Sequence, residues 1–288
     1  MSTTLERPKW LTRRISNIEA IDETVEILKS LSLNTVCDGA QCPNIGECFG
    51  NNTATFMILG NVCTRQCKFC AVTKGKTEPV NHSEPENIGI ACKEMGLKHV
   101  VVTSVTRDDL PDGGAEHFAE TVNEIKKRNP LSTIELLIPD LKGNWEALQT
   151  IIKSKPDIIN HNLETVSTLY GEVRPQAQYE RSLELLENVK KFDQDIYTKS
   201  GIMVGLGEKE EEIYSLMDDL RTFDCDILTI GQYLQPSKQH IEIKEYIHPV
   251  VFEKYKKAAD EKGFKYVASG PFVRSSYNAA LGINSLKK

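Results

Sequence analysis

The stretch Cys63-Thr-Arg-Gln-Cys67-Lys-Phe-Cys70 places three cysteines within eight residues, in a C-x3-C-x2-C pattern. It follows an apolar run, Thr55-Phe-Met-Ile-Leu59, that predicts a strand ending at Gly60-Asn61. Three thiolates this close along the chain can hold three irons of a [4Fe–4S] cluster, whereas an electron-transfer cluster takes four cysteines. A missing fourth ligand leaves one metal open to a small molecule, as in catalytic metal sites. We therefore interpret the stretch as a reactive iron–sulfur loop.

Two plainer interpretations of the same cysteines remain. Their i, i+4 and i+7 spacing would place them on one face of a helix, where cysteine packs as a small buried hydrophobe. A partial zinc site is the other, but zinc would want a fourth cysteine or histidine nearby. The nearest candidate, His82, follows Cys70 by twelve residues without ligand-like spacing. The iron–sulfur interpretation is favoured over both.

Composition is that of a globular protein, with 288 residues, 40% hydrophobic and 26% charged. The 35 basic and 41 acidic residues give a net charge of −6, which disfavours nucleic acid as a partner. The N-terminus lacks an apolar core of signal-peptide length, and no apolar run approaches the ~18 residues of a membrane span. We expect a cytoplasmic protein with no membrane partner, in which eight cysteines indicate metal binding or catalysis rather than disulfides.

A second cysteine group lies upstream, in Cys37-Asp-Gly-Ala-Gln-Cys42-Pro-Asn-Ile-Gly-Glu-Cys48. Offsets of five and eleven residues fit neither one helical face nor one strand face, so core packing explains them poorly. Its glycines and proline predict a loop, as expected where backbone bends around a cluster. Zinc again lacks a close fourth ligand. Cys92 and Cys225 each stand alone and are predicted to be structural.

Strand and helix patterns alternate from Thr55 onward. The predicted strands are 55–59, 99–103, 134–138, 157–161, 197–204, 227–230 and, less distinctly, 265–268. The predicted helices are 85–95, 115–128, 144–154, 181–192, 208–223 and 249–262, with an earlier helix at 18–31. This alternation predicts a parallel α/β sheet, either a barrel or an open doubly wound sheet. Six strong units, rather than the eight of a complete barrel, favour a partial barrel whose reactive edge is at the carboxyl ends of the strands.

Polar residues follow several of these strands. Asp112-Gly113-Gly114 opens a helix, where paired glycines allow close approach of a ligand, although an ordinary turn explains them as well. Asn162 and Glu164 follow the fourth strand. They could bind a ribose or an amino-acid group, or they could simply cap the turn that follows. The glycine-containing segment 201–208 departs from the Rossmann fingerprint and is a weak nucleotide signal. Near the C-terminus, Arg274-Ser-Ser-Tyr277 resembles a plain helix cap.

The C-x3-C-x2-C motif, with Phe69 before its last cysteine, resembles the radical S-adenosylmethionine (SAM) superfamily. The C-x4-C-x5-C group and the C-terminal Arg-Ser-Ser-Tyr resemble the lipoyl synthase family within it, over about 36–279. The resemblance implies a partial (β/α)6 TIM-type barrel at 51–268. It also implies an N-terminal arm and auxiliary-cluster loop at 1–50, and a C-terminal extension at 269–288.

The resemblance also implies two [4Fe–4S] clusters with different ligands. The first would be held by Cys63, Cys67 and Cys70, with SAM on its open iron. The second, auxiliary cluster would be held by Cys37, Cys42, Cys48 and a serine, for which Ser276 is preferred over Ser275. Residues implied to line the SAM pocket are Phe69, Asp112, Gly113, Gly114, Asn162, Glu164, Arg174 and Gly205.

The implied reaction is insertion of two sulfur atoms at C6 and C8 of an octanoyl group amide-linked to a lysine of a carrier protein. A 5′-deoxyadenosyl radical made from SAM would abstract each hydrogen, and the auxiliary cluster would donate the sulfur. Implied partners are octanoylated lipoyl domains or the glycine cleavage H protein, an electron donor such as ferredoxin or flavodoxin, and iron–sulfur carrier proteins.

Two alternatives stay open at this point. One is another radical SAM sulfur-inserting enzyme, similar to biotin synthase. A methylthiotransferase is disfavoured, because the chain has no room for that family's additional domains. The other is an iron–sulfur or zinc protein that catalyses nothing. Iron, acid-labile sulfide and SAM cleavage after anaerobic reconstitution separate the enzymes from the binding protein.

Overall fold

A parallel sheet forms the centre of the molecule. The computed structural model describes residues 6–12, 18–36, 44 and 55–276. Within these residues the sheet has seven strands in chain order, so each strand pairs in parallel with the one before it in the sheet. The strands are β1 (Thr55–Ile58), β4 (His99–Ser104), β5 (Thr133–Leu137), β6 (Ile158–Asn160), β7 (Tyr197–Val204), β8 (Ile227–Gln232) and β9 (Tyr266–Gly270).

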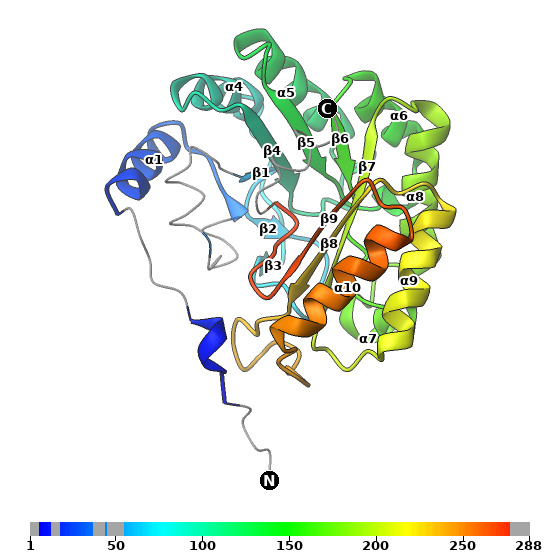
Figure 1. The fold of residues 1–288 in the computed structure, drawn as a ribbon. Coiled ribbons are helices and arrows are strands. Elements are labelled where there is room, and N and C mark those ends of the chain that lie inside the picture. The colour runs from blue at the N-terminus through cyan, green and yellow to red at the C-terminus, as the bar shows by residue number, and fades with distance from the viewer. Residues whose placement is uncertain (1–5, 13–17, 37–43, 45–54, 277–288) are drawn as a thin grey trace.

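Helices connect the strands and cover the outer side of the curved sheet (Figure 1). They are α4 (Glu84–Glu94), α5 (Ala115–Arg128), α6 (Trp145–Lys153), α7 (Tyr170–Val173), α8 (Tyr179–Phe192), α9 (Glu210–Thr222) and α10 (Pro249–Glu261), preceded by α1 (Ile18–Ser30). Short elements are η1 (Lys9–Leu11), η2 (Leu141–Gly143), η3 (Ser167–Leu169), β2 (Val62–Cys63) and β3 (Thr73–Lys74). No helix among the described residues is long and apolar enough to cross a membrane.

The strand order decides between the two predicted architectures. A doubly wound sheet reverses its strand order, whereas a barrel-type sheet adds each strand beyond the last. The order here never reverses, and β1 and β9 each have one strand partner among the described residues. The partial-barrel prediction is therefore confirmed, and β9 adds a seventh strand to the six predicted units. Every predicted strand and βα helix appears within about two residues of its expected bounds.

A buried ion pair crosses the sheet between β5 and β7. Glu135 has a fully buried side chain and accepts two hydrogen bonds from Lys199 Nζ, at 2.8 and 3.0 Å. Asn160 on β6 donates a third from Nδ2, at 3.0 Å. Burial alone would raise the pKa of Glu135, but Lys199 and the neighbouring His99 together outweigh it and lower that pKa to about 2.

Replacing Glu135 with glutamine should lower the free energy of unfolding by about 3 kcal/mol, because Lys199 loses its buried counter-charge. The folded pKa of Glu135 lies below its ordinary 4.5, so its contribution is complete above that pH and is lost as the pH falls toward 2. Denaturant unfolding should be measured near neutral pH and again between pH 4.5 and pH 2. The loss of unfolding free energy in the variant should be smaller at the lower pH. A constant deficit would contradict this assignment.

Candidate active site

The three cysteines of the C-x3-C-x2-C motif lie in a loop directly after β1, at the carboxyl edge of the sheet. β2 pairs in parallel with β3 through Val62–Thr73 and Cys63–Lys74, which brings the two ends of this loop together. All three thiols are half-buried. The residues between Cys63 and Cys70 form bends, turns and irregular backbone, so the alternative of a helix with the three cysteines on one face does not hold.

We call residues 63–70 the cysteine loop. Its backbone is held by segments that follow four other strands of the sheet. The bonds to those segments are Thr64 N–H to Thr106 O (3.0 Å), Gln66 N–H to Gln176 Oε1 (2.7 Å), Lys68 N–H to Val173 O (2.9 Å), Ile241 N–H to Lys68 O (3.0 Å), the His240 ring Nε2 with Cys70 O (3.1 Å), and the Arg65 side chain with Asp140 (2.6 Å). The loop is therefore supported by contacts that do not involve its thiols.

Burial affects the titration of two of the three thiols. Burial raises the pKa of the Cys67 thiol, against the opposing charge of Arg174, and raises the pKa of Cys70 to about 11. Bound iron deprotonates such thiols outright. Among the described residues, no group of three His, Cys, Asp or Glu side chains is gathered as around one metal ion.

Asn162, Glu164 and Arg174 meet beside the cysteine loop. Asn162 Nδ2 donates to Glu164 Oε1 at 3.1 Å, and Arg174 Nη1 donates to the Asn162 carbonyl at 2.7 Å. Asn162 Oδ1 and Arg174 Nε are buried without a protein partner, so one acceptor and one donor remain for a ligand. Burial raises the pKa of Glu164, against the charges of Arg174 and Arg274. These groups fit the ammonium and carboxylate of an amino-acid ligand such as SAM.

Within the segment 201–208, Gly201 is the residue that lies against Asn162. A Cβ on Gly201 would lie 2.9 Å from Asn162 Oδ1, so glycine leaves room for that side chain. Gly205 has φ +99°, and a Cβ there would lie 2.4 Å from the carbonyl oxygen of Glu245. Glu208 closes the same turn by accepting from the N–H groups of Gly205 and Leu206. Gly205 thus has a packing role, and its contact with SAM stays a prediction.

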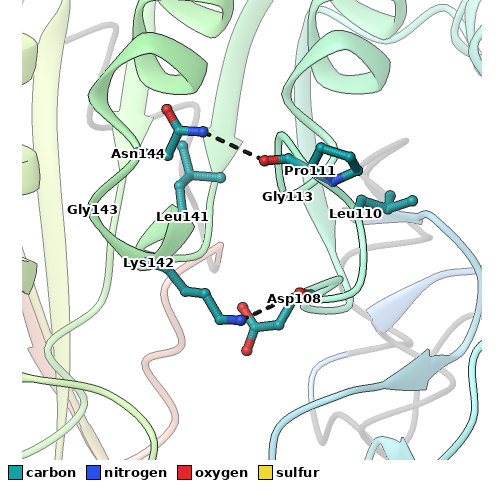
Figure 2. A pocket seen from close by; sticks show the side chains of 8 residues that line it. All are labelled: Asp108, Leu110, Pro111, Gly113, Leu141, Lys142, Gly143 and Asn144. Atoms are coloured by element: carbon teal, nitrogen blue, oxygen red, sulfur yellow. Dashed lines mark hydrogen bonds between the residues drawn. The ribbon is translucent and has the colours of Figure 1, made fainter.

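Asp112, Gly113 and Gly114 also have roles in building the fold. The Asp112 carboxylate accepts from Gly114 N at 2.9 Å and from Glu116 N at 2.8 Å, which caps α5. Gly114 has φ +92°, and a Cβ there would lie 2.3 Å from Leu59 Cδ1. Gly113 lines a cavity of about 230 Å³ between the loops that follow β4 and β5 (Figure 2). Their contact with SAM remains a prediction.

Phe69 and the lone cysteines lie in apolar surroundings. Phe69 is half-buried and packs against a small cluster formed by Val173, Leu206 and Tyr233 at the edge of the cysteine loop. Cys92 and Cys225 are fully buried in the main core, where burial raises the pKa of Cys225 to about 12. Both positions are compatible with the predicted structural role.

The C-terminal segment crosses the carboxyl end of β8. A Cβ on Gly231 would lie 2.1 Å from the carbonyl oxygen of Val273, so the two backbones touch. Ser275 and Ser276 follow and are half-buried. Cys37, Cys42 and Cys48 lie outside the described residues. Asn44, between two of them in sequence, is 1% exposed and donates from Nδ2 to the Phe272 carbonyl at 2.8 Å. Sequence analysis missed Gly231 and Asn44.

Comparison with known proteins identifies the class. Residues 57–220 match the family model described as the Radical SAM superfamily. Methylornithine synthase has a similar fold, with a TM-score of 0.56 at 15% identity over 91% of each chain. SuiB of Streptococcus suis bound to S-adenosylmethionine aligns with a TM-score of 0.59 at 14% identity, over 86% of this chain and 60% of that one. The fold and the cysteine loop define a radical SAM protein, a class that implies a [4Fe–4S] cluster and SAM.

Curated relatives identify the family within the radical SAM class. Lipoyl synthase of Caldanaerobacter subterraneus subsp. tengcongensis is 57% identical over 281 residues, covering 98% of both chains. The enzyme of the same name from Alkaliphilus metalliredigens is 57% identical, over 95% of this chain and 94% of that one. That of Staphylococcus aureus strain Newman is 50% identical, over 99% and 93%. The chain belongs to the lipoyl synthase family of radical SAM sulfurtransferases.

Proposed function

We propose that this enzyme inserts two sulfur atoms, at C6 and C8 of a protein-bound N6-octanoyl-lysine, to give lipoyl-lysine. The relatives that span nearly its whole length carry the name lipoyl synthase. The observation that carries the proposal is the hydrogen bond between Asn44 and the Phe272 carbonyl. It joins the middle of the C-x4-C-x5-C group to the segment that leads into Arg274-Ser-Ser-Tyr277, and these are the two motifs that carry the resemblance to the lipoyl synthase family.

Each cysteine group is proposed to hold one cluster. Cys63, Cys67 and Cys70 would hold the first, and Cys37, Cys42, Cys48 and Ser276 would hold the auxiliary cluster, with Ser275 as the alternative ligand. When bound, the two clusters and SAM supply a 5′-deoxyadenosyl radical and the sulfur that is inserted. The donor sets fit: half-buried thiols in one loop for the first cluster, and for the other a half-buried serine four residues after Phe272, whose carbonyl accepts from Asn44.

The side chains at the sheet edge are proposed to bind and orient SAM. Glu164 accepts from the ligand's ammonium group, while Arg174 Nε, buried without a protein partner, donates to its carboxylate. Phe69 and its apolar neighbours exclude water from the adenosyl side. Holding SAM in one orientation against the cysteine loop directs the radical toward the substrate chain and away from the protein.

The reaction requires two kinds of protein partner. One is an octanoylated carrier, such as a lipoyl domain or the glycine cleavage H protein. The other is a low-potential electron donor such as ferredoxin or flavodoxin. Iron–sulfur carrier proteins would reload the auxiliary site after its sulfur is consumed. We place the auxiliary loop in residues 1–50, the barrel in 51–268 and the serine-bearing extension in 269–288.

A Cys42→Ala variant tests the proposal. After anaerobic reconstitution, it should retain SAM cleavage but add no sulfur to an octanoyl-lysine peptide, because only the auxiliary cluster loses a ligand. Mass spectrometry of the peptide and chromatography of 5′-deoxyadenosine measure the two activities in one sample. Normal sulfur insertion by the variant would show that the upstream group has another role. Zinc without iron or sulfide in the unaltered protein would remove the enzyme assignment.

A further inference from the structure

Arg65 lies inside the cysteine loop, yet its side chain turns into the protein. Only 4% of this side chain is exposed. Its Nε and Nη2 donate to the two carboxylate oxygens of Asp108, at 2.8 and 2.9 Å, which makes a bidentate pair. Nη2 also donates to Asp140 Oδ1 at 2.6 Å. One guanidinium therefore joins the cysteine loop to the loops that follow β4 and β5.

Asp140 connects Arg65 to helix α8 through its two carboxylate oxygens. It is fully buried, and its second oxygen accepts from Arg181 Nε, at 3.0 Å, at the start of α8. Burial alone would raise the pKa of Asp140, but hydrogen bonding and the Arg65 charge outweigh it and hold that pKa well below its usual range. The next residues, Leu141 and Lys142, have φ of +48° and +52°. Each non-glycine residue in the left-handed region costs about 1 kcal/mol or more of conformational free energy. The surrounding hydrogen bonds and ion pairs must therefore hold this loop in its conformation.

The network also reaches a cysteine that we propose as a cluster ligand. The backbone N–H of Arg65 points to Cys63 Sγ, with N and S 3.4 Å apart. Hydrogen bonds to cluster sulfurs and nearby positive charge both raise a cluster's reduction potential. Arg65 and Arg181 balance the charges of Asp108 and Asp140. Removing one member therefore leaves a net charge beside the loop, and its sign depends on which residue is removed.

We propose that Arg65 is a positioning residue that sets the geometry and the reduction potential of the SAM-cleaving cluster, through its bidentate hold on Asp108 and its bond to Asp140. This inference rests on the proposed cluster ligation by Cys63, Cys67 and Cys70. It assigns Arg65 no contact with SAM or with the octanoyl substrate. Lysine cannot replace it, because an ammonium group lacks the planar fork that spans both carboxylates.

Three substitutions in the anaerobically reconstituted full chain separate geometry from charge. Arg65→Gln removes both and should lower the midpoint potential, while Asp108→Asn removes a negative charge and should raise it. Arg65→Lys keeps the charge, so the potential should stay near that of the unaltered protein. SAM cleavage per cluster should fall about 10- to 100-fold in both Arg65 variants, as for other residues that orient metal ligands. Potentials come from EPR-monitored redox titration, and cleavage from 5′-deoxyadenosine formation.

Glu135→Gln is the matched control, since it also breaks a buried ion pair of the same sheet but leaves the cysteine loop untouched. It should lower stability without changing potential or cleavage per cluster. Asp108 is 17% exposed, so its asparagine variant tests the proposal even if the Arg65 variants fold poorly. Equal potentials in Asp108→Asn and the unaltered chain, with cleavage falling only in step with iron content, would overturn the proposal. These readouts need no octanoyl substrate, so failure of sulfur insertion alone would refute the proposed function and leave this result standing.

Discussion

Replacing Cys67 with alanine is expected to abolish SAM cleavage while the protein stays folded. The cysteine loop is held by backbone bonds and by side chains other than the thiols, including Lys74 Nζ to the Cys67 carbonyl at 3.1 Å. Loss of one thiolate therefore removes a cluster ligand and little of the loop's support. Iron should fall from about eight to about four per chain, since each cluster holds four irons and the auxiliary group is unaltered.

The measurements are iron, acid-labile sulfide and 5′-deoxyadenosine after anaerobic reconstitution with reductant. Cys225→Ala is the matched control, because Cys225 is fully buried and its sulfur contacts backbone carbonyls, at 3.5 Å for Ile227. That variant should keep its iron and its SAM cleavage, apart from a small loss of stability. SAM cleavage by Cys67→Ala at the unaltered rate would show that the C-x3-C-x2-C thiols do not hold the reactive cluster.

The strands and helices were predictable because their signals are local. A buried parallel strand reads as a continuous apolar run, as in Val100 to Val102, and an amphipathic helix repeats its apolar residues every three or four positions. The position of the cysteine loop followed from the same reading, since the loop comes directly after the first strand. Strand order needed the structure, because alternation of strand and helix fits both a barrel and a doubly wound sheet.

Contacts between distant parts of the chain were not predictable. Arg65 stands inside the most informative motif, but its partners Asp108 and Asp140 are 43 and 75 residues away, and nothing local selects them. Asn44 and Phe272 are 228 residues apart. Glycine is ambiguous for a related reason: Gly114 suggested close approach of a ligand, and the structure shows that the side chain of Leu59 also comes close to it. Sequence shows that a position needs glycine but not what comes close to it.

Gly231→Ala is expected to uncouple sulfur insertion from SAM cleavage. A methyl group at this position would lie 2.1 Å from the Val273 carbonyl oxygen and 3.1 Å from its carbon. β8 is paired on both sides, with β7 and β9, so the C-terminal segment is the part that must move. That movement shifts Ser275 and Ser276 relative to the loop that contains Asn44. The three cysteines proposed to hold the SAM-cleaving cluster keep their own supports.

A displacement of about 1 Å at a reacting centre costs about 100-fold in rate, so sulfur addition to an octanoyl-lysine peptide should fall by that order. Cleavage of SAM should fall much less, and the ratio of lipoyl product to 5′-deoxyadenosine is the quantity to measure. Gly171→Ala supplies the control, because a Cβ there meets no atom within 4 Å. If both variants keep the ratio of the unaltered enzyme, the C-terminal segment does not position the auxiliary site. If only Gly231→Ala lowers it, close contact between β8 and Val273 is what aligns the sulfur donor with the radical.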